Sequence, residues 1–162
     1  MSSEMEPRNN ENRMILMCDL EKCTGCRICE YVCSFEKEKS FDLKKARIKA
    51  VRFNPTLSGA LACTLCNEAL CVKACPTEAL TKSQRGTVVV DRKKCVRCGW
   101  CVYACDVGAV FYDSEQNVPI VCDLCDGKPK CMEVCPEEAL KFEPVDEIIT
   151  KRTISRIRNI LH

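Results

Sequence analysis

Cysteine sets the chemistry available to this chain of 162 residues, which contains 17 of them. Sixteen fall into four groups, and each group is a triplet of nearby cysteines followed, after three residues, by a fourth. Thiolates that recur at fixed offsets are typical ligands of metal–sulfur centres. The groups, numbered one to four along the chain, are Cys23, Cys26, Cys29 and Cys33; Cys63, Cys66, Cys71 and Cys75; Cys95, Cys98, Cys101 and Cys105; and Cys122, Cys125, Cys131 and Cys135.

The spacing within each group favours iron–sulfur clusters over zinc. Three closely spaced thiolates can ligate three corners of one cubane, while the fourth, carried onward by a turn of helix, reaches a different cluster, as in two-cluster bacterial ferredoxins. A zinc ribbon instead pairs two CxxC knuckles and has no use for a third and fourth cysteine at the same offsets. Because all sixteen positions are filled, the sequence predicts four 4Fe–4S clusters. A structural zinc-binding protein is the alternative from another class.

Composition and charge exclude several other functions. The one histidine, His162, is the last residue, so a histidine base, a histidine-ligated zinc and a Rieske centre lack their imidazoles. A formal charge of +2 gives no electrostatic case for nucleic acid or an anionic membrane. The sequence shows no nucleophile, base or substrate pocket. We therefore expect a protein that is not itself an enzyme.

The N-terminal residues bear on location. The stretch MSSEMEPRNNEN is polar, and the apolar run that follows, Met14 to Met17, is too short for a signal-peptide core or a membrane span. We expect a cytoplasmic protein without a direct membrane anchor. In a reducing cytosol, dense cysteines are metal ligands more often than disulfides.

Short strand-like segments indicate which fourth cysteine joins which triplet. Between groups two and three, CPTEAL, the polar KSQRG and the strand-like TVVVD give the outline of a two-cluster ferredoxin. The second such phrase, CPEEALKF, has no group after it, but MILMCDLEKCTGC at the start of the chain has the same form as TVVVDRKKCVRC. This match predicts a nested order, in which groups four and one form a unit around groups two and three. The competing order is tandem, with groups one and two in one unit and groups three and four in the other.

The nested order predicts four ligand sets. They are Cys23, Cys26, Cys29 and Cys135 (cluster 1); Cys63, Cys66, Cys71 and Cys105 (cluster 2); Cys95, Cys98, Cys101 and Cys75 (cluster 3); and Cys122, Cys125, Cys131 and Cys33 (cluster 4).

The expected fold is α+β, with two ferredoxin-like 4Fe–4S units built from short β-hairpins and short helices. The inner unit is residues 63–105, and the outer unit is 14–62 together with 106–145, including a connecting insertion at 34–62. Residues 1–13 are expected to form a flexible N-terminus. Apolar residues at Ile154, Ile157 and Ile160 predict a C-terminal helix over 146–162, which packs either on its own chain or on a partner.

Four residues outside the ligand positions need an interpretation. Cys18 lies outside all four spacings, so we expect a buried structural thiol. Tyr31 and Tyr103 occupy matching places in groups one and three, and we expect both rings, like that of Trp100, to pack over a cluster.

At CTGCRICEYVC, ALACTLCNEALCVKACPTEAL and CDLCDGKPKCMEVCPEEAL the chain resembles the four-cluster electron-transfer subunits of molybdenum and tungsten enzymes, the iron–sulfur subunit family of dimethyl sulfoxide reductase. The resemblance covers about residues 14–142. Within that family, CTGCRICEYVCSFEKEKSFDLKKARIKAVRF is most similar to the small soluble partners of tungsten aldehyde oxidoreductase and benzoyl-CoA reductase. Long insertions and a membrane-contacting extension are missing, and Leu70 stands where many members have proline. The resemblance also implies the nested ligation.

The predicted function is therefore that of an electron-transfer subunit in anaerobic metabolism. It would conduct single electrons between a catalytic tungsten- or molybdenum-pterin subunit of the aldehyde oxidoreductase type and a flavin- or ferredoxin-type redox partner. The alternatives are an electron-transfer subunit of a hydrogenase or formate dehydrogenase, and a free polyferredoxin. The sequence leaves open the catalytic partner and its substrate, the cluster potentials, the direction of electron flow and the stoichiometry of the complex.

Overall fold

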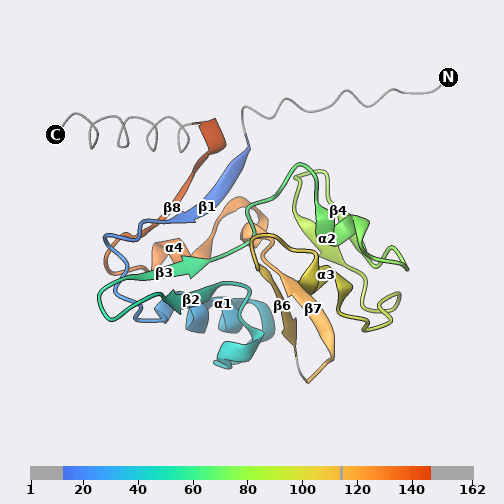
Figure 1. Ribbon diagram of the computed structural model, residues 1–162. Coiled ribbons are helices and arrows are strands. Elements are labelled where there is room, and N and C mark those ends of the chain that lie inside the picture. Colours follow the sequence, from blue (N-terminus) through green and yellow to red (C-terminus); the bar gives the residue numbers. More distant parts are fainter. Residues whose placement is uncertain (1–12, 114, 147–162) are drawn as a thin grey trace.

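The computed structural model describes residues 13–113 and 115–146 (Figure 1). The predicted C-terminal helix lies outside the described residues except for Asp146, and so does the predicted N-terminal segment except for Arg13.

Short elements make up the described residues, which form a small α+β structure with short hairpins and few helices, as the sequence predicts. Only α1 exceeds five residues among the described elements, so most elements depend on tertiary contacts rather than on their own propensity. In order, the elements are β1 (Met14–Cys18), α1 (Ile28–Glu38), η2 (Leu43–Lys45), β2 (Lys49–Arg52), β3 (Ser58–Leu61), α2 (Leu70–Lys73), β4 (Leu80–Lys82), β5 (Val88–Val90), α3 (Trp100–Tyr103), β6 (Val110–Asp113), β7 (Val118–Val121), η3 (Leu124–Gly127), α4 (Lys130–Glu133) and β8 (Leu140–Pro144).

The described strands form four two-stranded antiparallel sheets. Three of them, β2–β3, β4–β5 and β6–β7, join strands that are neighbours in the sequence. The fourth joins the two ends of the described residues, because β8 pairs with β1 in a register that places Leu16 opposite Phe142. Backbone hydrogen bonds extend this pair at both ends, from Asp19 N to Ala139 O and from Val145 N to Arg13 O.

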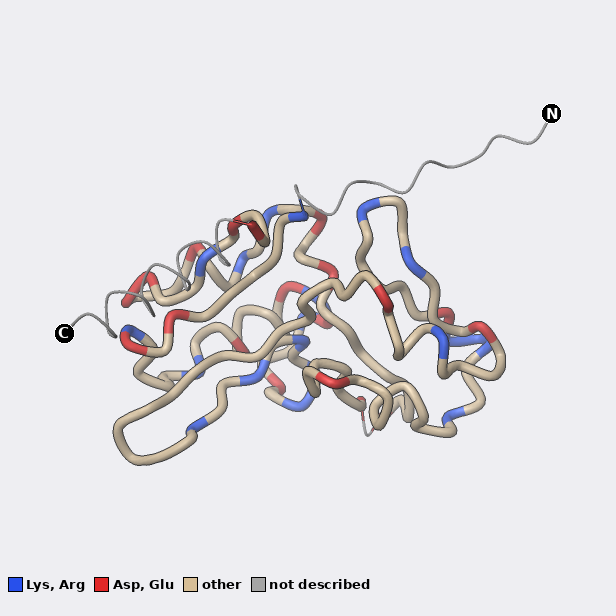
Figure 2. Tube along the Cα trace, turned by 45° about the horizontal axis from the view of Figure 1, so that its top comes forward, with Lys and Arg blue, Asp and Glu red and all other residues tan. Residues whose placement is uncertain are grey.

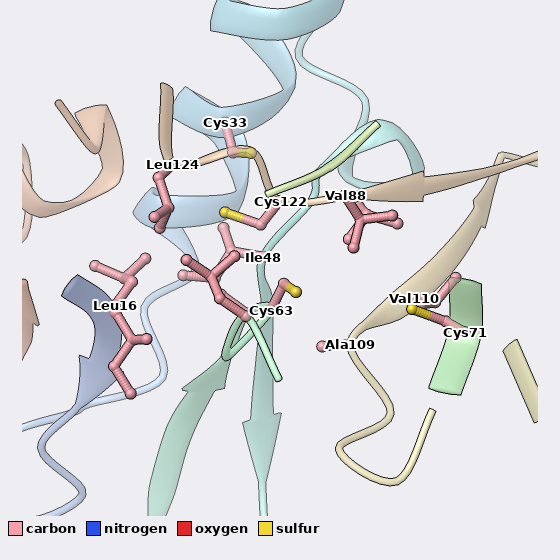
Figure 3. Packing of buried hydrophobic residues seen from close by; sticks show 14 of the residues in the cluster. Leu16, Cys33, Ile48, Cys63, Cys71, Val88, Ala109, Val110, Cys122 and Leu124 are labelled. Atoms are coloured by element: carbon pink, nitrogen blue, oxygen red, sulfur yellow. The ribbon is translucent and has the colours of Figure 1, made fainter. Parts of the chain in front are cut away.

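The elements of groups one and four lie apart from those of groups two and three. In Figure 1, β1, β8, α1 and α4 occupy the left part of the molecule, and α2, α3 and β4 occupy the right part. The two parts meet in a core that contains cysteines as well as aliphatic residues. Figure 3 shows Ile48, which is only 1 % exposed, in the same cluster as Cys63 and Cys122.

Group one differs from the other three groups in the length of its helix, α1. The third cysteine of groups two, three and four lies in a helix of four residues, whereas α1 has eleven and contains both Cys29 and Cys33. Its buried Glu30 accepts hydrogen bonds from the Arg27 guanidinium (2.9 Å) and from the backbone N–H of Ala50 in β2 (2.5 Å). These bonds satisfy the buried carboxylate and fix α1 against β2.

The pairing of β1 with β8 generates a stability prediction. Replacing the buried Leu16 with alanine should lower the free energy of unfolding by about 2–5 kcal/mol, because a cavity remains where the side chain was. Leu20→Ala is the matched control, since that side chain is 43 % exposed, and it should cost less than about 1 kcal/mol. Anaerobic urea unfolding followed by far-ultraviolet circular dichroism would compare them. Equal transition midpoints would contradict the prediction.

Candidate iron–sulfur centres

Two pockets among the described residues are lined by cysteines from more than one group. The first combines the triplet of group one with the last cysteine of group four, and the second combines the triplet of group two with the last cysteine of group three. The cysteines of the four groups that line them are Cys23, Cys26, Cys29 and Cys135 in the first pocket, which Cys18 also lines, and Cys63, Cys66, Cys71 and Cys105 in the second. In each case the structure brings together the predicted set.

For the other two sets, helix packing and the mutual influence of thiols on their pKa values indicate which cysteines are neighbours: α1 packs against α4, and α2 packs against α3. Burial raises the pKa of the Cys131 thiol, and the neighbouring Cys122 and Cys33 raise it further. Burial likewise raises the pKa of Cys33, and Cys125 adds to this effect. Cys33 of helix α1 therefore lies near the thiols of group four.

The same reasoning applies to group three. Burial raises the pKa of the Cys101 thiol to about 11, and both Cys75 and Cys95 contribute to the increase. The fourth cysteine of group two therefore lies beside the triplet of group three. Cys98, the remaining member of that set, is exposed.

Each fourth cysteine accepts a backbone hydrogen bond at sulfur. Three of these bonds come from the alanine four residues further along, and the fourth comes from a distant residue because α1 continues past Cys33. The donors and acceptors are Ala79 N to Cys75 Sγ (3.2 Å), Ala109 N to Cys105 Sγ (3.3 Å), Ala139 N to Cys135 Sγ (3.3 Å) and Arg47 N to Cys33 Sγ (3.2 Å). An N–H donor favours the thiolate form that a metal centre requires.

The backbone of the CxxC turns is repeated in all four groups. The second residue after the first cysteine has a positive φ in every case, although only one of the four is glycine: Gly25 (70°), Leu65 (53°), Arg97 (63°) and Leu124 (58°). A left-handed conformation costs a non-glycine residue on the order of 1 kcal/mol, so other interactions must impose it. Ligation of the flanking cysteines to a common centre is such an interaction.

An ion-pair network fixes helix α1 beside group four. Asp123 accepts a hydrogen bond from Lys37 Nζ (2.7 Å) and another from Arg47 Nη1 (3.0 Å). Burial raises the pKa of Asp123, but these two cations outweigh that effect and hold the pKa below its ordinary value. The network thus joins the helix that carries Cys33 to the turn that carries Cys125.

The donor sets fit 4Fe–4S clusters. Burial raises the pKa of Cys63 to about 11 and the pKa of Cys122 to about 12, so without a cluster these thiols are protonated at neutral pH. A bound cluster would displace those protons and pair the thiolates with iron. In the described part of the protein, no three His, Cys, Asp or Glu side chains converge closely enough to hold a single metal ion. The thiols instead surround pockets.

The sequence predicts a buried structural thiol at Cys18 and packing of the Trp100 and Tyr103 rings over a cluster. Cys18 is half-buried in the wall of the first pocket, where burial raises its pKa to about 12 and Cys23 and Cys135 are neighbours. Trp100 and Tyr103 lie at the surface, 67 % and 91 % exposed, rather than in the core. The alternation of β1 places Cys18 on the pocket side, and this could be seen only once the strand's partner was known.

Two family models match this protein. A 4Fe–4S dicluster domain matches residues 62–109, and a 4Fe–4S binding domain matches residues 20–36 and again 123–139. The protein is therefore a 4Fe–4S ferredoxin-type protein with multiple clusters.

Similarity to curated relatives identifies the family within this class of 4Fe–4S proteins. The protein is 38 % identical over 136 residues to the polyferredoxin-like subunit of the aliphatic sulfonate oxidoreductase of Pyrococcus furiosus, covering 82 % of this sequence and 79 % of the relative. It is 33 % identical over 153 residues to the B subunit of the anaerobic dimethyl sulfoxide reductase of Haemophilus influenzae, covering 82 % and 75 %. The protein belongs to this family of iron–sulfur electron-transfer subunits of oxidoreductase complexes, and it is not a catalytic subunit.

A solved structure covers most of the protein. One polypeptide of the active-site complex BamBC of benzoyl-coenzyme A reductase, in complex with zinc, is 27 % identical, with 88 % of this sequence and 90 % of that polypeptide covered and a TM-score of 0.48.

As for membrane crossing, no helix among the described residues is long and apolar enough to span a bilayer.

Cys18 generates a prediction about ligand number. Cys18→Ala should retain the iron and acid-labile sulfide content of the unchanged protein, because the first pocket already contains four other thiols. Cys23→Ala is the control and should lose about four iron atoms, those of one cubane. Iron and sulfide assays on anaerobically purified protein measure both. Loss of about four iron atoms from the Cys18 variant would make Cys18 a ligand.

Proposed function

We propose that this protein carries four 4Fe–4S clusters and conducts single electrons between a catalytic tungsten- or molybdenum-pterin subunit, of the aldehyde oxidoreductase type, and a second redox partner of the flavin or ferredoxin type. The supporting observation is that the described cysteines gather into four sets, each made of one triplet and a cysteine from another group. When bound, each cluster accepts and releases one electron at a time.

The nested ligation is part of the proposal. Clusters 2 and 3 belong to an inner unit, residues 63–105, and the dicluster match at residues 62–109 supports this division. Clusters 1 and 4 belong to an outer unit formed by residues 14–62 and 106–145. Pairing of β1 with β8 supports the outer unit, because it holds Cys135 next to the triplet of group one.

The influence of thiols on one another's pKa indicates which sets are neighbours. Cys29 of the first set contributes to the raised pKa of Cys131 in the fourth set, so these two sets are adjacent. Cys63 of the second set contributes to the raised pKa of Cys122, so the fourth and second sets are adjacent as well. Cys105 of group three lies with the triplet of group two, and Cys75 of group two lies beside the triplet of group three, so the second and third sets are adjacent. If all four sets hold clusters, neighbouring clusters would follow one another in the order 1, 4, 2 and 3.

The protein's own residues bind, orient and shield the clusters. The thiolates fix each cluster in place, and the backbone N–H groups of Ala79, Ala109 and Ala139 donate toward the sulfur atoms, which influences reduction potential. Buried Leu65 and Val110, among others, exclude water from the pockets.

A second candidate concerns the identity of the catalytic partner. Likeness to the B subunit of dimethyl sulfoxide reductase favours a partner of that reductase type, and the electron transfer subunit of a thiosulfate reductase of Salmonella typhi is also 28 % identical over 160 residues. We retain the aldehyde oxidoreductase type as the first candidate, and a cytoplasmic, anaerobic setting as part of the proposal.

Purification under anaerobic conditions tests the function. The tagged protein, isolated from its native host, should contain about 16 iron and 16 sulfide per molecule, as four cubanes require. A large subunit that contains a pterin with tungsten or molybdenum should copurify with it. Metal analysis and mass spectrometry measure both. Stoichiometric zinc without sulfide would refute the cluster proposal, and clusters without a large subunit would favour a free polyferredoxin.

Site-resolved alkylation tests the nested order. In Cys135→Ala, cluster 1 should be lost or labile, so iodoacetamide should label Cys23, Cys26 and Cys29 in the otherwise native protein. The control Cys75→Ala should expose Cys95, Cys98 and Cys101 instead. Peptide mass spectrometry locates the labels. Labelling of the group-three triplet in the Cys135 variant would support the tandem order and contradict ours.

A further inference from the structure

Large apolar side chains lie exposed beside an exposed ligand cysteine in groups one and three, and those of group three are the more exposed. Val96 is 60 % exposed, Trp100 67 % and Tyr103 91 %, and all three lie within five residues of Cys98. Single exposed apolar residues are ordinary, but a cluster of them with two aromatic rings marks an interaction site. We call Val96, Trp100 and Tyr103, together with Lys93, Lys94 and Arg97, the group-three face.

The face is also the most basic of the four cysteine regions. Residues 91–105, which comprise group three and the four residues before it, contain four cations and one acid, a formal charge of +3. The equivalent segments 19–33, 59–75 and 118–135 carry −1, 0 and −1. A bound cluster with its four thiolates adds about −2 to each region alike, so the difference persists in the loaded protein.

The cations of the face are available to a partner. Within the described residues no ion pair involves Lys93, Lys94 or Arg97, and all three are exposed. Figure 2 shows several Lys and Arg positions, with Asp and Glu among them, at the right-hand end of the molecule, the side on which Figure 1 labels α2 and α3. Residues beside β1 and β8 lie toward the opposite side.

We propose that the group-three face docks an acidic one-electron carrier protein. The proposal rests on the proposed function, in which cluster 3 is one end of the electron path. In the encounter one electron passes between the carrier's redox centre and cluster 3, so that one is oxidised as the other is reduced. Aromatic anchors surrounded by cations are typical of binding hot spots, and opposite charges speed diffusional encounter.

The size and polarity of the face favour a transient carrier over a permanent subunit. Obligate interfaces are large and resemble a domain core, whereas transient redox encounters use small polar surfaces. A face with three apolar side chains and three cations is of the second kind. The opposite end of the path, segment 19–33, carries a formal charge of −1 and would not attract the same carrier.

Charge reversal tests the docking. An acidic plant-type 2Fe–2S ferredoxin serves as the probe, and stopped-flow absorbance measures the second-order rate of its electron exchange with the full, cluster-loaded protein. Lys93→Glu with Lys94→Glu should slow this exchange at least about tenfold at low ionic strength, and the difference should shrink in high salt. The matched control, Lys44→Glu with Arg52→Glu, reverses two exposed cations elsewhere and should change the rate less than about twofold.

Removal of the aromatic rings provides the second arm. Trp100→Ala with Tyr103→Ala should weaken binding of the same ferredoxin about tenfold or more, with little dependence on salt. Phe53→Ala, which removes a ring 61 % exposed elsewhere, should leave binding unchanged. Iron content and electron paramagnetic resonance spectra of all variants must equal those of the unchanged protein.

The outcomes separate this proposal from the one on which it rests. Equal slowing by both charge variants, or unchanged binding after loss of both rings, overturns the docking proposal while the clusters remain intact. If the unchanged protein contained no cluster iron, that result would instead contradict the proposed function. Cytochrome c, a basic protein, provides the reverse check, because its exchange should become faster with Lys93→Glu and Lys94→Glu. A slower exchange would count against the docking proposal.

Discussion

The structure depends on the exchange of cysteines between distant segments. Each set of thiols takes three members from one turn and the fourth from another, and in the first pocket Cys29 and Cys135 are more than a hundred residues apart in the sequence. Helices of four residues and two-stranded sheets are marginal by themselves. Ligation of a common centre would supply both the folding energy and the geometry that such short elements lack. The same cross-links that would hold the clusters also hold the fold.

The proposed electron path follows from this arrangement. Cys122 and Cys63 lie near each other where the two parts of the molecule meet, and Ile48 packs in the same core cluster. The left part in Figure 1 contains the first and fourth sets, and the right part contains the second and third. The first set neighbours the fourth, the fourth neighbours the second, and the second neighbours the third. Segments 19–33 and 91–105, which carry the triplets of the first and third sets, differ in formal charge.

Much of this organisation could be predicted from the sequence. The strand-like segments at MILMC and TVVVD are β1 and β5. CPEEALKF has no cysteine group after it, and MILMCDLEKCTGC matches TVVVDRKKCVRC in form, so the sequence indicates that the two ends come together, as β8 and β1 do. The spacing of apolar residues and the residue types found in turns are local features of the sequence, so these strands could be predicted without knowledge of the tertiary packing. The position of Cys18, the bond from Arg47 to Cys33 and the exposure of Trp100 could not be predicted, because each depends on what packs beside a residue. The length of α1 could not be predicted either, because its buried Glu30 accepts a hydrogen bond from the backbone of Ala50 in β2.

The antiparallel pairing of the first described strand with the last also has a consequence for biosynthesis. On the ribosome, the second set of thiols is complete once Cys105 has emerged, when about two thirds of the sequence has been made. The first set waits for Cys135, and β1 has no partner until β8 has been made. Until then its thiols and strand edge are open to oxidation and to mispairing. Cluster insertion during synthesis would therefore reach the second set before the first.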